Sequence, residues 1–188
     1  MRKGTTVGFI VAVAGVLLTT MPSVYANHVA TGSEAYAVPR LGLSRFQFVV
    51  AREDPTNFVQ SAMAGGGGPM SFQTFMISTA IVSFTIVDEP DETRKVTITG
   101  ELESTTVLGV GPDLLPFTEL VPFTAIGVDK AISGGADRFS LAVAYSANSA
   151  QGELFESLGF GTCTATCTMT FEGPVTRGDI FVHTSGGD

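Results

Sequence analysis

The two cysteines of the chain, Cys163 and Cys167, are separated by three residues in the stretch GTCTATCTMTF. A disulfide needs Cα atoms closer than about 7 Å, whereas four steps along an extended strand span about 13 Å. The intervening Thr-Ala-Thr must therefore turn or bulge if the two thiols pair. A metal site needs about four ligands and would find only two histidines to add. We predict a disulfide, with free thiols as the main alternative.

Carboxylates gather in two of the predicted turns. Four of them crowd one loop and two flank another: Asp88, Glu89, Asp91 and Glu92, then Asp129 and Asp137. Calcium takes six to eight oxygen ligands, and loops of extracellular proteins often supply them. These six residues are the candidate calcium ligands, and calcium is the only cofactor considered. The alternative is that acidic turn residues keep the ends of hairpins soluble.

Catalytic patterns are sparse. The histidines are His28, close to the predicted new N-terminus, and His183, five positions before residue 188. A hydrolase needs a nucleophile, a base and an orienting group, and neither histidine has that setting in the sequence. Glu101 and Glu103 could form a carboxylate pair of the glycosidase type, but their spacing is typical of a solvated strand face. The sequence leaves enzymatic activity undecided and favours a non-catalytic chain.

Alternating hydrophobicity marks the elements that would position these residues. Apolar side chains recur at every second position in 46–50, 82–86, 96–102 and 139–145. Because successive strand residues point to opposite faces, each segment has one buried and one wetter face. We predict hairpins that join 81–87 to 95–103 and 121–128 to 138–146. The fold class is all-β: a jelly-roll-like antiparallel sandwich of about eight short strands, with a small barrel as the alternative.

Two segments interrupt this pattern. The stretch AMAGGGG at 62–68 predicts a flexible surface loop, because glycine loses most conformational entropy on ordering. Residues 152–160 predict a short helical turn.

The first 26 residues have the features of a secretory signal peptide. Arg2 and Lys3 precede an apolar run from Val7 to Leu18, and small residues occupy the positions in Val24-Tyr25-Ala26 that a signal peptidase reads. The run is short of the ~20 apolar residues of a spanning helix. We predict cleavage after Ala26, a single all-β domain over 27–188 and no membrane span after cleavage.

The composition bears on partners and location. Removing 26 residues from 188 leaves 162, and net charge falls from −8 to −10 because the signal holds two basic residues and no acid. An acidic chain repels nucleic acid, so nucleic-acid binding is excluded. The chain has no tryptophan, which disfavours both an outer-membrane barrel with aromatic girdles and a sugar-binding module. The predicted location is secreted, periplasmic or extracellular.

The run VPFTAIGVDKAISGGADRFSLAVAY and the later FEGPVTRGDIFVH resemble bacterial secreted β-domains of the post-COAP type. In that type a Gly-rich, Asp-rich loop precedes an alternating strand, and a strand ending in His closes the domain. The resemblance covers about the last two thirds of the chain. It implies the fold and the location, and no catalytic residue.

These observations predict a secreted or cell-surface, non-catalytic β-domain with a structural, adhesive or binding role. Its partner is not defined by the sequence, and a cell-surface partner is the candidate. The alternative is a secreted enzyme or a barrel that binds a small ligand at its mouth. A barrel with an enclosed polar pocket would favour that alternative.

Overall fold

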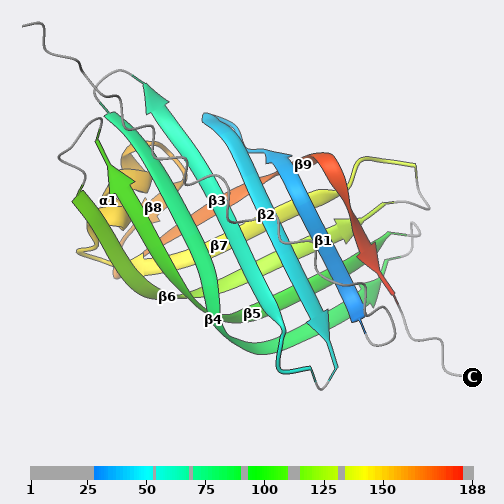
Figure 1. Ribbon diagram of the computed structural model, residues 1–188. Coiled ribbons are helices and arrows are strands. Elements are labelled where there is room, and N and C mark those ends of the chain that lie inside the picture. Colours follow the sequence, from blue (N-terminus) through cyan, green and yellow to red (C-terminus); the bar gives the residue numbers. More distant parts are fainter. Residues whose placement is uncertain are drawn as a thin grey trace, which may run out of the picture.

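The computed structural model describes residues 28–52, 54–67, 70–89, 93–109, 115–130 and 134–183. Within them the chain is almost entirely strand, as predicted (Figure 1). The strands are β1 (His28–Ala37), β2 (Leu41–Ala51), β3 (Phe58–Gly67), β4 (Met70–Asp88), β5 (Arg94–Leu108), β6 (Leu115–Asp129), β7 (Arg138–Ser146), β8 (Gly161–Cys163) and β9 (Thr166–Val182). A short helix, α1 (Ala150–Ser157), follows β7 and overlaps the segment 152–160 that was predicted to contain a helical turn, starting two residues before it.

The strands form a closed antiparallel barrel. They pair in chain order from β1 to β7, β7 then pairs with β9, and β9 returns to β1. Eight strands make the ring, and β8 is a short outer partner of β9. The small barrel that the sequence left as the alternative is therefore observed, and the jelly-roll-like sandwich is not confirmed. Alternating hydrophobicity does not separate the two, because both folds bury one face of every strand.

Both predicted hairpins are confirmed. β4 pairs with β5, so that Phe84 lies opposite Ile98. β6 pairs with β7, so that Ala125 lies opposite Leu141. Each connection was predicted from polar turn residues between two alternating segments, which is a local signal.

Aromatic rings from different walls meet inside the barrel. Phe46 of β2 stacks on Phe139 of β7 with ring centroids 4.2 Å apart. Phe48 of β2 crosses to the opposite wall, where a Cβ on Gly127 of β6 would lie only 2.8 Å from the Phe48 ring. Side chains therefore fill this level of the interior, as expected for a barrel of eight strands.

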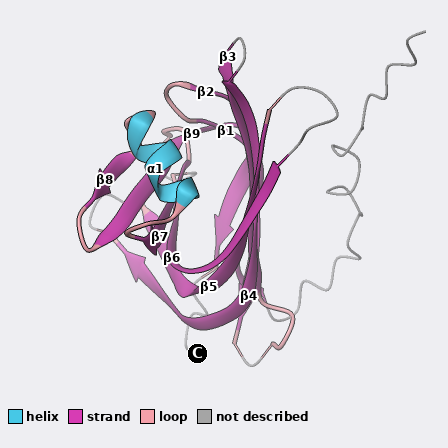
Figure 2. Ribbon diagram, turned by 90° about the vertical axis from the view of Figure 1, so that its left-hand side faces the viewer, coloured by secondary structure: helices cyan, strands magenta, loops and turns pink. Residues whose placement is uncertain are grey.

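The two ends of the barrel differ. We call them the helix end, where α1 and β8 lie, and the termini end, where β1 starts and β9 finishes (Figure 2). At the helix end, α1 begins at Ser149, whose hydroxyl accepts a hydrogen bond from the Gly152 amide at 3.3 Å. Phe155 of α1 is fully buried and packs edge-on against Phe72 and Phe171 from two strands. The helix thus closes this end of the core.

The glycine-rich segment corrects one prediction. Residues 62–67 are not a loop but the second half of β3, in regular register with β4 from Ala62 opposite Phe75 to Gly67 opposite Met70. At Gly65, a Cβ would lie 2.7 Å from a methyl carbon of Leu41 and 2.8 Å from the Phe72 ring. The large neighbours occupy the space that a side chain would need, so the fold requires glycine in a strand here.

Neighbouring strands separate at two places in the wall. At the helix end, β6 and β7 pair only between Phe123 and Val128 of β6, so residues 115–122 have no β7 partner. At the termini end, β3 pairs with β4 only as far as Ile77, so residues 79–88 of β4 pair with β5 alone. Figure 1 shows β4 and β5 curving together at that end. These two gaps differ in what covers them.

Candidate functional site

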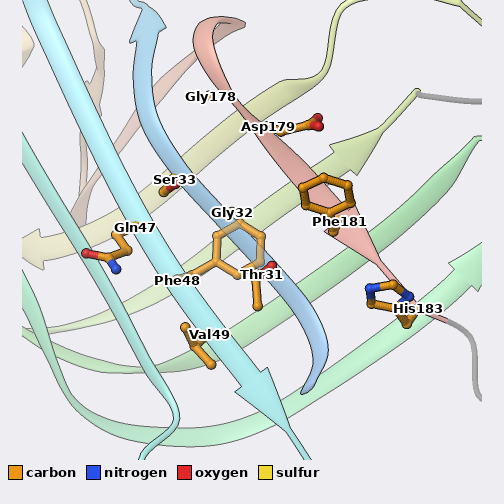
Figure 3. A pocket seen from close by; sticks show the side chains of 10 residues that line it. All are labelled: Thr31, Gly32, Ser33, Gln47, Phe48, Val49, Gly178, Asp179, Phe181 and His183. Atoms are coloured by element: carbon orange, nitrogen blue, oxygen red, sulfur yellow. The ribbon is translucent and has the colours of Figure 1, made fainter. Parts of the chain in front are cut away.

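A groove runs along β1 on the outside of the barrel (Figure 3). Its volume is about 560 Å³. The floor consists of the outward residues Thr31 and Ser33 of β1, whose side chains are small. Gln47 and Val49 of β2 form one side, because alternation points them outward while Phe48 points inward. A strand of small residues between two strands of larger ones therefore hollows the wall; we call this hollow the β1 groove.

The other side of the β1 groove carries an aromatic pair on β9. Phe181 is 49% exposed, and its ring lies parallel to that of His183, at an interplanar angle of 7° and a centroid separation of 6.5 Å. In a strand whose inward neighbours Ile180 and Val182 are buried, both rings must face the solvent. The pair offers a flat apolar surface at the rim of a polar groove.

Asp179 adds a carboxylate to the same side. Its pKa is raised above the ordinary value of 3.8, first by a hydrogen bond with the Asp137 carboxyl, then by partial burial and by the nearby charge of Asp137. The Ile180 amide donates to both carboxylates, to Asp137 at 2.8 Å and to Asp179 at 3.0 Å. Asp179 was missed in the sequence because it lies alone in TRGDIFVH, and only the pairing of β9 with β1 puts it beside the groove.

His183 is exposed just after β9. Within the described residues it has no hydrogen bond to a serine or to a carboxylate, and its neighbour is the Phe181 ring. Glu101 and Glu103 are both exposed on the outer face of β5, as a solvated strand face requires. The side chains of the β1 groove can stack on a ligand and form hydrogen bonds with it.

Two of the four calcium candidates between β4 and β5 have basic partners. Asp88 lies 3.4 Å from the Arg94 guanidinium, and Glu89 lies 3.0 Å from the Lys95 ammonium. Each pair links the end of β4 to the start of β5 across their connection. Asp91 and Glu92 lie outside the described residues.

Asp129 and Asp137, the other two candidates, are buried at the termini end. Asp129 accepts from the Val182 amide at 3.1 Å. Asp137 accepts from the amides of Lys130 and Ile180, both at 2.8 Å. The two carboxylates thus hold the end of β9 against the β6–β7 connection. Among the described residues, no three His, Cys, Asp or Glu side chains gather as a metal site would require, and calcium binding stays a prediction.

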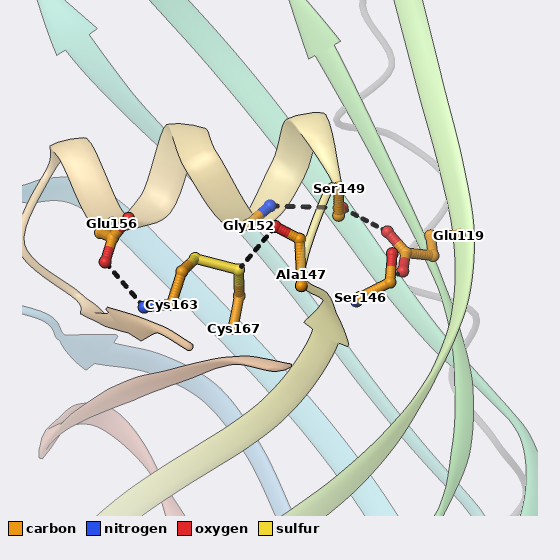
Figure 4. The surroundings of a disulfide bond; sticks show 8 residues. All are labelled: Glu119, Ser146, Ala147, Ser149, Gly152, Glu156, Cys163 and Cys167. Atoms are coloured by element: carbon orange, nitrogen blue, oxygen red, sulfur yellow. Dashed lines mark hydrogen bonds between the residues drawn. A yellow bond between two sulfur atoms is a disulfide. The ribbon is translucent and has the colours of Figure 1, made fainter. Parts of the chain in front are cut away.

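Cys163 and Cys167 form a disulfide in the β8–β9 hairpin, with Cα atoms 4.0 Å apart (Figure 4). The predicted bend in Thr-Ala-Thr is confirmed, since the Thr164 amide donates to the Thr166 carbonyl at 3.0 Å and β9 starts at Thr166. The bridge lies against α1. The Glu156 carboxylate accepts from the Cys163 amide at 2.7 Å, so the hairpin and the helix form one unit.

A chain of buried polar groups lies under α1. Gln151 of α1 places its side-chain nitrogen 2.9 Å from the Thr106 hydroxyl and 3.0 Å from the Ser104 carbonyl. The Ser104 hydroxyl in turn lies 2.9 Å from that of Tyr145. Burial raises the pKa of Tyr145 above its ordinary value, more than the hydrogen bond with Ser104 lowers it. Extending the alternation of β5 beyond Leu102 would have placed Ser104 and Thr106 inside the barrel.

Comparison with known proteins provides no relative from which a role could be transferred. No family model matches the chain, and neither a curated protein nor a solved structure is significantly similar to it. The resemblance to post-COAP domains therefore stays a prediction. The helix of the described residues, α1, has eight residues and is too short to cross a bilayer. The site must be interpreted from its own geometry.

Proposed function

We propose that this chain is an exported, non-catalytic barrel domain with a binding or adhesive role, and that the β1 groove holds a saccharide of a cell surface. The observation that carries the proposal is the stacked pair of Phe181 and His183 at the rim of the groove. Exposed aromatic rings beside hydrogen-bonding side chains suit ligands that have an apolar ring face and polar edges.

The polar side chains of the β1 groove complement hydroxyl groups. Thr31 and Ser33 supply hydroxyls, Gln47 supplies an amide and Asp179 supplies a carboxylate. An acidic chain disfavours anionic ligands, so a neutral saccharide is the better candidate. The sequence disfavoured sugar binding because tryptophan is absent; here the Phe181 and His183 rings take that role.

The alternative was a ligand or substrate at the mouth of the barrel. At the helix end, Phe155 and Gln151 occupy the interior and are almost completely buried. At the termini end, the Arg94 side chain donates to the Val182 carbonyl at 3.2 Å and so links β5 to β9 across the end of the barrel. Binding on the outer wall is therefore better supported than chemistry at a mouth.

The test is binding of neutral oligosaccharides and cell-wall glycan fragments to protein purified from the export fraction, by ligand-observed NMR and calorimetry. Phe181→Ala should weaken binding at least about tenfold, because it removes the stacking surface. Leu120→Ala is the matched control, since Leu120 is 58% exposed on β6, away from the groove. Absence of binding across the panel, or equal loss in both variants, would contradict the proposal.

Export itself has a direct test. Mass spectrometry of the protein recovered outside the cytoplasm should give an N-terminus at Asn27. An intact Met1 in that fraction would contradict cleavage after Ala26.

A further inference from the structure

The gap between β3 and β4 exposes a sheet edge. We call residues 79–88 of β4 the open edge. The pairing of β3 with β4 ends where the Val59 amide donates to the Ser78 hydroxyl at 2.9 Å instead of to a backbone carbonyl. A groove of about 920 Å³ lies beside the open edge and separates it from the β2–β3 connection at Arg52 and Pro55. The place that a longer β3 would fill is therefore empty of other described strands.

The backbone of the open edge has groups available for a further strand. The Glu89 amide donates to the Thr93 carbonyl at 2.8 Å. In an antiparallel pair, residues alternate between facing the partner strand and facing away from it. Counting back from Glu89, Thr85 turns its amide and carbonyl toward β5, whereas Phe84 and Ile86 turn theirs toward the groove.

From Ser83 to Val87 the open edge lacks the features that usually prevent strand addition. Natural edges are protected by lysine, proline, inward-pointing charge or bulges. No charged residue, proline or glycine occurs from Ile77 to Val87, and Val82 is 76% exposed. Register shifts occur between Ser78 and Ala80 and between Ile81 and Ser83. From Ser83 to Asp88 the register with β5 is regular, so this part can accept a partner.

We propose that the open edge binds the open edge of a second copy of the chain, so that two β4 strands pair antiparallel and two barrels share one continuous sheet. The surface is distinct from the β1 groove, so the proposal does not depend on the proposed ligand.

The directions in which the backbone amides and carbonyls point determine the register of the proposed pair. Pairing about Thr85 places Phe84 opposite the second copy's Ile86, with both residues turning their amides and carbonyls toward each other. An aromatic side chain opposite a β-branched one is a favourable cross-strand pair. Asp88 then lies opposite the second copy's Val82, and the two Asp88 carboxylates are about 20 Å apart, beyond the Debye length.

The self-complementary register favours a second copy as the occupant, and the charge distribution permits contact at this edge. The chain has a net charge of −8, so two copies repel each other over most of their surfaces. Residues 79–87 are uncharged, so pairing them with themselves brings no like charges face to face, and Asp88 already lies beside Arg94. The open edge is thus a surface on which two acidic copies can meet.

The experiment is sedimentation velocity on protein purified from the export fraction, over a wide range of concentration. A dimer is expected. Thr85 is exposed and lies on the twofold axis of the proposed pairing. Thr85→Asp and Thr85→Lys should each weaken dimerisation at least about tenfold, because each brings two like charges face to face. An equimolar mixture of the two variants should recover the dimer.

Thr170→Asp is the matched control, because Thr170 is exposed on β9 in a part of the sheet that pairs with β7. It should leave the dimer unchanged. A monomer at every concentration would overturn the proposal. So would a dimer that persists in both Thr85 variants, or a mixture that stays monomeric.

Discussion

The wall of the barrel has two gaps between neighbouring strands, and the two gaps differ in the residues that cover them. At the helix end, the part of β6 without a β7 partner carries Pro116, Pro122 and Glu119. The Glu119 carboxylate accepts from the Ser146 amide at 2.9 Å and from the Ser149 hydroxyl, and Gln151 lies within 3.2 Å of the Phe117 carbonyl. Proline, charge and a helix thus cover this gap.

At the termini end, the open edge has no such cover. From Thr79 to Val87 its side chains are uncharged, and among the described residues the far side of the groove is lined by the end of β2 and the β2–β3 connection. A sheet edge must either be protected or be paired. The comparison indicates that the covered gap contributes to the stability of one barrel, whereas the open gap is available for association.

The largest expected difference in the free energy of unfolding is between truncation of Phe155 at the helix end and truncation of Phe84 at the open edge. Phe155→Ala should lower the free energy of unfolding by about 3–5 kcal/mol, because it leaves a cavity in a fully buried cluster. Phe84→Ala should cost about 1 kcal/mol, since Phe84 is only half buried. Urea unfolding of both variants measures the two values. Equal losses would show that the two gaps matter equally to the fold.

The disulfide tests the unit that covers the helix end. Cys163→Ser should lower the free energy of unfolding by about 2 kcal/mol, the chain-entropy value for so short a loop. Calorimetry should show a melting temperature about 4–8 °C lower for a domain of this size. A loss well above this would mean that α1 detaches with the hairpin. Two titratable thiols in unreduced native protein would contradict the bridge.

Alkaline pH tests the polar groups under α1. Burial raises the pKa of Tyr36 to about 12 and raises that of Tyr145 as well. A tyrosine with a raised pKa keeps its proton in the folded state but loses it near pH 10 when unfolded, so the free energy of unfolding falls as pH rises above that value. Denaturant titrations at several alkaline pH values should show a shallower fall in Tyr145→Phe. An unchanged slope would contradict the burial of Tyr145.

Truncation at the open edge should have little effect within one barrel. Val82→Ala should change the free energy of unfolding by less than about 0.5 kcal/mol at concentrations where the protein is monomeric. Urea unfolding at low concentration measures it, and Val121→Ala, at a buried position of β6, is the destabilised control. A large loss in Val82→Ala would mean that the open edge is already covered.

The effect of calcium on the melting temperature tests whether the acidic loops at the termini end bind an ion. Asp88 and Glu89 have basic partners, and Asp129 and Asp137 accept backbone hydrogen bonds. The calcium prediction requires calcium to raise the melting temperature by several degrees more than magnesium, or sodium chloride of equal ionic strength, does; equal melting temperatures would leave these carboxylates as partners within the fold. A specific increase of several degrees would place an ion at these loops, because binding to the folded state alone stabilises it.

Features that depend on residues close in sequence were predicted correctly more often than features that depend on contacts between distant segments. The hairpins around 88–94 and 129–138, the bend between the cysteines and the helical turn were all predicted, because residues close in sequence specify them. The glycine-rich part of β3 was predicted wrongly. Local preference favours a loop there, but Leu41 and Phe72 occupy the space beside Gly65 and make glycine suitable for a strand.

The candidate site was largely beyond the reach of the sequence. His183 was singled out as a histidine near the last strand, but nothing local placed it or Phe181 beside Thr31 or Gln47. The acidic residues were selected for their density, and the structure gives the four that it describes, Asp88, Glu89, Asp129 and Asp137, basic or backbone partners. Density in sequence does not determine which donors surround a carboxylate, because strands from distant parts of the chain supply them.

The sequence by itself determined an all-β chain, its hairpins and the bend that a disulfide between Cys163 and Cys167 requires. Only the tertiary structure decided that β1 pairs with β9, with Ala30 opposite Val182. That pairing closes a barrel, creates the β1 groove and leaves the open edge of β4. The physical reason is that a strand pattern specifies which face is buried. The choice of neighbour depends on backbone hydrogen bonds and packing between segments from opposite ends of the chain.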